Sequence, residues 1–145
     1  MVGKSAYGAS AREIAELFAA YLEGGSNRPA IALSSTELDG YSKNAIEKSL
    51  EAFGYTPDSC TFATTSELDA QAIFLLIEGL DPLYVISTDG NATAKLAQAY
   101  RLNLPDDQPA RILGRPAVTF ADLHSLMATP ESKQKAWKLL KSLPH

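Results

Sequence analysis

Four acidic residues are the first candidates for chemistry in this sequence, because each follows an apolar run of the length of a buried strand. They are Glu37, Asp39, Asp89 and Asp122. Paired carboxylates can exchange protons in acid–base catalysis, and converging carboxylate oxygens can hold a divalent cation. Residues of this type also cap helices, and Asp39 stands where the next helix would begin. The sequence leaves both readings open.

His124 lies close to one of these acids and completes the set of catalytic candidates. It follows Asp122 by two positions in a segment that is predicted to be helical. A nucleophilic triad needs a serine or cysteine and an acid near the histidine, and neither His124 nor His145 has an evident partner of this kind. If the protein is an enzyme, its catalytic residues are expected among Glu37, Asp39, Asp89, Asp122 and His124.

A small polar segment, Ser87-Thr88-Asp89-Gly90-Asn91, could bind a ligand at the start of a helix. Backbone N–H groups at such a position attract anions, which makes Ser87, Thr88 and Asn91 candidate binding residues. The segment lacks the lysine of a P-loop and the spacing of a dinucleotide-binding loop. A capping residue followed by a turn glycine is the simpler interpretation. No cofactor or metal is predicted.

The basic residues gather in the last third of the chain. Residues 1–100 carry 6 Lys/Arg and 13 Asp/Glu, a net charge of −7, whereas residues 101–145 carry 7 and 4, a net of +3. The binding candidates in this region are Arg111, Arg115, Lys135 and Lys138. Such a surface suits an acidic protein partner or a phosphate backbone. The lysines of the last helix can also form an ordinary solvated face.

Alternating strand and helix patterns position these residues. Apolar runs predict core strands at 29–34, 59–63, 83–87 and 116–120, with a short edge strand at 111–113. Helical spacing and caps predict helices between them, including 66–78, which opens with a capping box from Thr64 to Glu67. The order predicts an α/β three-layer sandwich with a central, mainly parallel four-stranded sheet.

Two helices carry specific predictions about burial. The helix 66–78 is apolar nearly all round, so Ile73, Phe74 and Ile77 are expected to be almost fully buried. In the last helix, which opens with Pro130 after the cap Thr129, the residues expected to face the core are Ala136, Trp137, Leu140 and Leu143. Lys135 and Lys138 are then turned outward.

Length and composition indicate one ordinary globular domain, residues 1–145, with residues 1–9 expected to be flexible. The apolar fraction is 46% and the charged fraction 21%. The single cysteine, Cys60, allows no internal disulfide and no Cys-based metal cluster within the chain, and its strand context predicts a buried side chain. No apolar run has the length of a membrane span or signal peptide. These features predict a cytoplasmic protein that does not contact a membrane.

Three stretches resemble the uracil-DNA glycosylase superfamily. AIEKSLEAFGY at Ala45–Tyr55 stands where that family has a helix before its second strand, and Leu68–Leu96 resembles its helix, apolar strand and Ala-rich helix. VTFADLHSLMATPESKQKAWKLL at Val118–Leu140 resembles its last strand, motif loop and closing helix, with Pro130, Lys133 and Trp137 as the most specific points. The resemblance implies a glycosylase-like fold over residues 29–143.

The catalytic positions that the family uses are occupied differently here. The water-positioning loop reads Ser34–Gly40 without the family's glycine–proline frame, and Thr64 and Thr65 stand where the base-reading asparagine is common. Where the family has the histidine that stabilises the departing anion, this chain has Ala121 and Asp122. A carboxylate would repel that developing charge.

Two classes of function remain from the sequence. One is a non-catalytic macromolecular interaction module on a glycosylase-like scaffold, with a link to DNA replication or repair, a protein partner, and nucleic acid as a further partner class through the C-terminal basic face. The alternative is a divergent uracil-DNA glycosylase or another hydrolase acting at the carboxyl edge of the sheet. A basic groove at that edge would favour the enzyme, and an exposed apolar patch elsewhere would favour the module.

Overall fold

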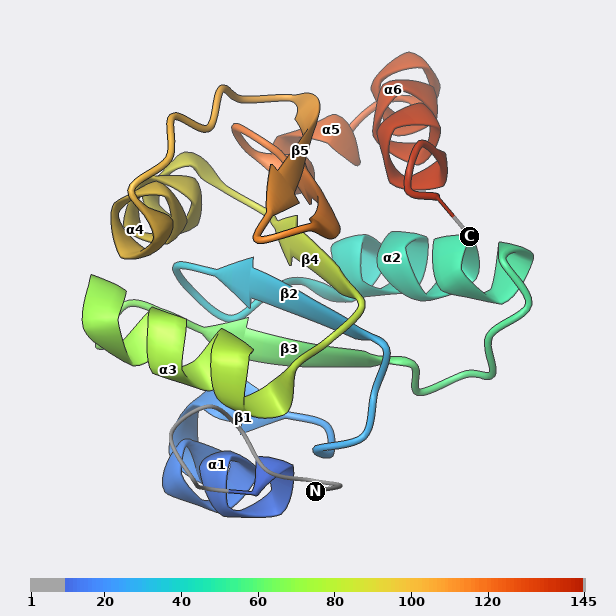
Figure 1. Cartoon of the computed structure of the whole chain (residues 1–145). Coiled ribbons are helices and arrows are strands. Elements are labelled where there is room, and N and C mark those ends of the chain that lie inside the picture. Colours follow the sequence, from blue (N-terminus) through green and yellow to red (C-terminus); the bar gives the residue numbers. More distant parts are fainter. Residues whose placement is uncertain (1–9, 145) are drawn as a thin grey trace.

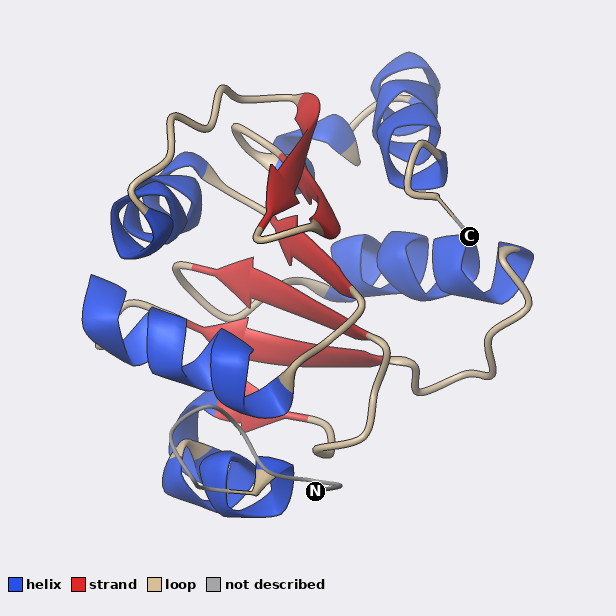
Figure 2. Cartoon of the chain, viewed as in Figure 1, coloured by secondary structure: helices blue, strands red, loops and turns tan. Residues whose placement is uncertain are grey.

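The computed structural model describes residues 10–144, and the predicted flexibility of residues 1–9 lies outside them. One sheet runs between two layers of helices, which makes this an α/β protein (Figures 1 and 2). The helices are α1 (Ala11–Leu17), the 3-10 turn η1 (Ala19–Tyr21), α2 (Gly40–Ala52), α3 (Ala70–Leu80), α4 (Gly90–Tyr100), α5 (Leu123–Leu126) and α6 (Pro130–Lys141). The strands are β1 (Leu22–Glu23), β2 (Ala30–Ser34), β3 (Cys60–Thr64), β4 (Tyr84–Ser87), β5 (Gln108–Ile112) and β6 (Arg115–Thr119).

The sheet has six strands in the order β1-β3-β2-β4-β6-β5. The central four are parallel to one another and correspond to the four predicted core strands, while β1 and β5 pair antiparallel at the two edges. The predicted four-stranded sheet is therefore too small, and the sheet is mixed. Strand β1 has only two residues at the end of a helical apolar pattern, and β5 is mostly exposed, so neither shows a buried-strand signal.

Strand β5 returns to β6 through a two-residue turn at Leu113 and Gly114. Both residues have positive φ, 49° and 85°, which is the backbone that tight hairpins adopt to match strand twist. Glycine adopts it without steric cost, whereas a leucine in this region is uncommon. The hairpin extends the predicted edge strand 111–113 back to Gln108.

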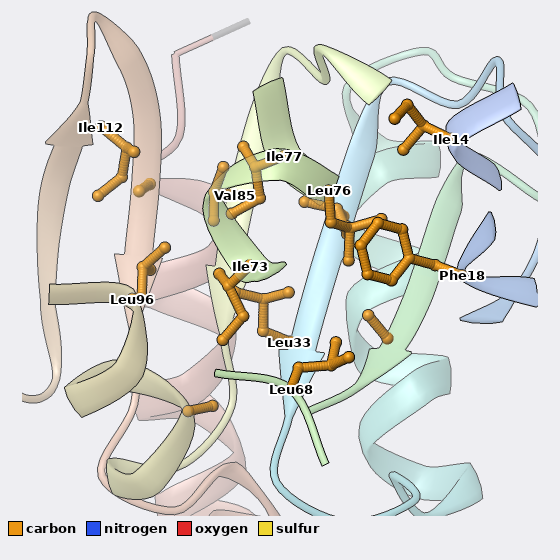
Figure 3. Close-up of a cluster of buried hydrophobic side chains, with 14 residues drawn as sticks. Ile14, Phe18, Leu33, Leu68, Ile73, Leu76, Ile77, Val85, Leu96 and Ile112 are labelled. Atoms are coloured by element: carbon orange, nitrogen blue, oxygen red, sulfur yellow. The ribbon is translucent and has the colours of Figure 1, made fainter. Parts of the chain in front are cut away.

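Strand residues alternate between two cores, as the period of a β-strand requires. On one face, Leu33 and Val85 pack under α1, α3 and α4, and Figure 3 shows this cluster. On the other face, Ala32 and Ile86 pack under α2, α5 and α6. The two helix layers are thus α1, α3 and α4 against α2, α5 and α6.

Helix α3 begins later than predicted and one of its core residues is misassigned. Its N-cap is Asp69, which accepts from the Ala72 N–H at 2.8 Å, rather than Thr64, which is the last residue of β3. Ile73 and Ile77 are fully buried as predicted. Phe74 is only partly buried, because it points sideways to Tyr100 of α4, with ring centroids 5.0 Å apart.

Local capping signals in the second half of the chain are confirmed. Asp89 caps α4, and Thr129 caps α6 with Pro130 at its first position. Ala136, Leu140 and Leu143 are buried as predicted. Within residues 10–144 no helix combines the length and apolar character needed to cross a membrane.

Candidate functional sites

A pocket of about 610 Å³ lies at the carboxyl ends of β2, β4 and β6. The chain leaves β2 toward β3 on one side and returns to β4 on the other, so the connections diverge between β2 and β4. A crevice at such a point is the usual ligand site of doubly wound sheets. This is the switch-point pocket, and it is bounded by the loops that follow the three strands.

The four predicted acids all line the switch-point pocket: Glu37, Asp39, Asp89 and Asp122. Three of them also cap helices, which was the alternative reading of the sequence. Their carboxylates accept from backbone N–H groups in the first turns of α2, α4 and α5, at 3.0, 2.9 and 3.3 Å. Among residues 10–144 no three His, Cys, Asp or Glu side chains form a group that could hold a metal ion.

Asp89 also ties two loops together across the pocket. Its second oxygen accepts from the backbone N–H and the hydroxyl of Ser35, at 2.8 and 2.9 Å. Because both oxygens are occupied by groups of the protein, Asp89 serves the structure of the site. Sequence reasoning found its position but not this cross-link.

His124 has an acidic partner that the sequence did not reveal. Its Nδ1 lies 2.9 Å from Oδ1 of Asp39, which also accepts from the Ser42 hydroxyl at 2.7 Å. Burial acts to raise the pKa of Asp39, but hydrogen bonds from Ser42 and His124 outweigh it and leave that pKa lowered. The imidazole itself is 71% exposed. A carboxylate that fixes one ring nitrogen prepares the other nitrogen to accept a proton.

The predicted binding segment after β4 contributes little to the pocket surface. Ser87 is buried and its hydroxyl pairs with that of Thr93 at 2.7 Å, which gives it a structural role in the fold. Thr88 lines the pocket, but its hydroxyl donates to Ser34 at 2.7 Å. Asn91 remains exposed at the rim. With Asp89 as the cap, the N-terminus of α4 already has its negative charge.

The electrostatics of the switch-point pocket are acidic. Its lining, all within the described residues, includes the four acids and His124 but neither lysine nor arginine. A phosphate or a departing nucleobase anion would meet repulsion there.

Two of the predicted basic binding residues are engaged with the protein itself. Arg115 forms ion pairs at 2.6 Å with Glu78 and with Asp81, donates to the Pro82 carbonyl, and its side chain is only 13% exposed. It joins the start of β6 to the end of α3, so these contacts give Arg115 a structural role in the fold. Arg111 is exposed and donates to Gly114 in the β5–β6 turn.

Lys135 and Lys138, the other two predicted basic binding residues, are exposed on α6 as predicted, but neither belongs to the lining of the switch-point pocket or of the groove between α2 and α6. Trp137, predicted to face the core, instead lines a surface groove of about 330 Å³ between α2 and α6. Helical spacing could not show that Trp137 lies at the margin of the core, because the buried face of α6 is narrow and passes through Ala136 and Leu140. We call this feature the α2–α6 groove.

The α2–α6 groove has a mainly apolar surface with a basic rim. Its lining residues are Tyr41, Asn44, Ala45 and Lys48 from α2, Met127 after α5, and Lys133, Gln134 and Trp137 from α6. Tyr41 is 74% exposed, the highest value among the large apolar side chains described. Two lysines lie over the rings of the groove, Lys133 over Tyr41 at 5.9 Å and Lys141 over Trp137 at 5.5 Å. The groove shares no lining residue with the switch-point pocket.

Comparison with known proteins adds no assignment: no family model matches the chain, and no curated protein matches it.

Proposed function

We propose that this protein is a non-catalytic module that binds another protein through the α2–α6 groove. The observation that carries the proposal is the apolar groove itself, which is lined by an exposed tyrosine, Tyr41 of α2, and a partly buried tryptophan, Trp137 of α6. Aromatic side chains are costly to leave in water and are enriched at protein interfaces. Two aromatic side chains in one groove therefore contribute most to stability when a bound partner removes them from water.

The scaffold in this proposal is glycosylase-like, and that part rests on the sequence resemblance. Two features agree with it: the parallel central strands lie where the resemblance expects strands, and a Pro-initiated helix closes the domain. The residues that carry the resemblance most specifically include Lys133 and Trp137, and both line the α2–α6 groove. A role beside DNA replication or repair follows from the resemblance alone and is part of the proposal.

The character of the switch-point pocket also favours a module over a glycosylase. An enzyme acting on DNA at this edge would need positive charge to hold phosphates and a group that stabilises the departing base anion. The lining is acidic instead, and Asp122 is engaged as the cap of α5.

The test is affinity capture from an extract of the source cells with immobilised protein and two charge-matched variants. Lys48→Glu/Lys133→Glu alters the groove, whereas Lys135→Glu/Lys138→Glu alters exposed lysines outside it by the same charge. We expect proteins captured by wild type to be retained by the second variant and lost from the first. Identical capture by all three proteins would contradict a groove-dependent module. Circular dichroism verifies that each variant is folded.

The Asp39–His124 pair favours a second candidate, a hydrolase acting at the carboxyl edge. In that role Nε2 of His124 would take a proton from water as the water attacks an ester or a glycosidic carbon, and Asp39 would stabilise the resulting imidazolium. p-Nitrophenyl acetate is a suitable first probe. This candidate requires hydrolysis above the buffer rate that is lost in His124→Gln and unaffected by Lys135→Glu. Rates equal to those of His124→Gln would eliminate it.

A further inference from the structure

The α2–α6 groove has the opposite charge to the rest of the molecule. The chain carries a formal net charge of −4, but the groove is lined by two lysines, Lys48 and Lys133, and by no acidic residue. Lys141 lies just outside this lining, over the ring of Trp137. A local reversal of sign around an apolar surface is a feature that selects a partner by charge as well as by shape.

Helical spacing arranges the apolar and basic groups in two facing rows. Tyr41, Ala45 and Lys48 lie on one side of α2, because positions four and three apart share a helix face. On α6, Lys133 and Trp137 are four apart in the same way. The apolar centre of the groove is therefore flanked by a cation on each helix.

Both groove lysines are accessible to a partner. Among residues 10–144, Lys48 has one ion pair, at 3.5 Å to Glu51 in the next turn, and its side chain is 61% exposed. Exposed ion pairs of this kind contribute little to stability, so Lys48 can exchange Glu51 for a carboxylate of a partner at a small cost in free energy. Lys133 lies over the Tyr41 ring and is exposed.

We propose that the groove binds an acidic segment of a partner protein, with an apolar anchor side chain between Tyr41 and Trp137 and flanking carboxylates on Lys48 and Lys133. This rests on the proposed function and names the chemistry of the partner. A cavity of about 330 Å³ holds one or two large side chains rather than a folded surface. A short segment that inserts anchors into a groove is a common mode of recognition.

The same observations argue against a nucleic acid in the groove. Bases bind by stacking on open aromatic faces, and here a lysine already lies over one face of each ring. The surrounding molecule is acidic and would repel a phosphate backbone. A short segment that brings only a few carboxylates is repelled less than a backbone with a charge at every nucleotide, and its apolar anchor can pack against ring edges as well as faces.

The experiment is selection of a random peptide display library on the full chain, with counter-selection on Lys48→Glu/Lys133→Glu. We expect the enriched peptides to combine an aromatic or leucine anchor with Asp or Glu on both sides. Trp137 is the single tryptophan of the chain, so Trp-free versions of these peptides can be titrated by its fluorescence. We expect the groove variant to bind them at least about tenfold more weakly and Lys135→Glu/Lys138→Glu to bind within about twofold of wild type.

Three results would overturn this inference: groove-dependent peptides that are neutral or basic, no groove-dependent enrichment at all, or tighter binding of a Trp137-quenching oligothymidylate with steep salt dependence. Its failure can be told apart from failure of the proposed function. If affinity capture yields groove-dependent protein partners while selected peptides are not acidic, the module stands and the partner chemistry is wrong. If neither is groove-dependent, both are wrong.

Discussion

Substituting Gly79 by alanine tests the packing of helix α1 against helix α3. Gly79 lies in the last turn of α3, where Ile14 of α1 packs directly over its backbone. A Cβ at this position would lie 2.4 Å from Cγ1, 2.9 Å from Cγ2 and 3.0 Å from Cδ1 of Ile14. Carbon atoms in contact are normally about 3.5–4.0 Å apart, so the helices must separate or Ile14 must move.

Two opposing effects set the magnitude. Replacing glycine by alanine within a helix ordinarily stabilises it by up to about 1 kcal/mol. Overpacking a well-filled core costs about 1–3 kcal/mol, and the β-branched Ile14 has few rotamers with which to escape. We therefore expect Gly79→Ala to lower the free energy of unfolding by about 1–2 kcal/mol. That loss corresponds to a fall in Tm of about 2–8 °C for a domain of this size.

The assay is urea denaturation followed by circular dichroism and Trp137 fluorescence. Gly40→Ala is the matched control, because Gly40 is the first residue of α2 and an added Cβ there meets no atom within 4 Å. It should be neutral or mildly stabilising. Gly79→Ala should also become neutral or stabilising in an Ile14→Ala background, since that change removes all three clashing atoms. A Gly79→Ala protein as stable as wild type would refute the close packing of α1 on α3.

Four further predictions concern other parts of the molecule. Arg115→Met should lower the free energy of unfolding by about 2–4 kcal/mol, because it leaves the largely buried Glu78 without its cation. The double variant Arg115→Met/Glu78→Leu should recover part of that loss. Equal stability of Arg115→Met and wild type in urea would exclude the structural role of Arg115. Asp39→Ala should lower the free energy of unfolding by about 1 kcal/mol near pH 6, because it removes the N-cap of α2. Because the pKa of Asp39 is lowered in the folded protein, its carboxylate stabilises the fold at pH values above its ordinary pKa of 3.8. The difference in stability between Asp39→Ala and wild type should therefore shrink as the pH falls below 3.8. Burial raises the pKa of the Cys60 thiol, so Ellman's reagent should label Cys60 only upon unfolding, and stoichiometric labelling in native buffer would contradict its burial. Uracil-containing single- or double-stranded DNA should yield no abasic sites with this protein, and site formation abolished by His124→Gln would revive the glycosylase alternative.

Much of the fold follows from signals that act over a few residues. Apolar runs place the four parallel strands, and the caps Asp89 and Thr129 begin their helices where the sequence predicts, because a cap bonds to an N–H only three residues away. The same locality explains why the acids of the switch-point pocket could be found. Residues that follow parallel strands must meet at one edge of the sheet, so Glu37, Asp89 and Asp122 share a pocket.

What tertiary structure alone decides is which surfaces meet. Phe74 and Trp137 look like core residues by spacing, yet the neighbouring helices cover only part of α3 and α6 and leave both rings at the margin. The sequence predicts Arg115 to be a basic surface residue, whereas in the structure β6 places it against the end of α3. The Asp39–His124 pair joins the N-cap of α2 to α5, which lie far apart in the sequence, and no periodicity connects them. Sequence patterns report the environment of a residue along its own element, whereas pairings between distant elements depend on how whole layers pack, which is a property of the complete chain.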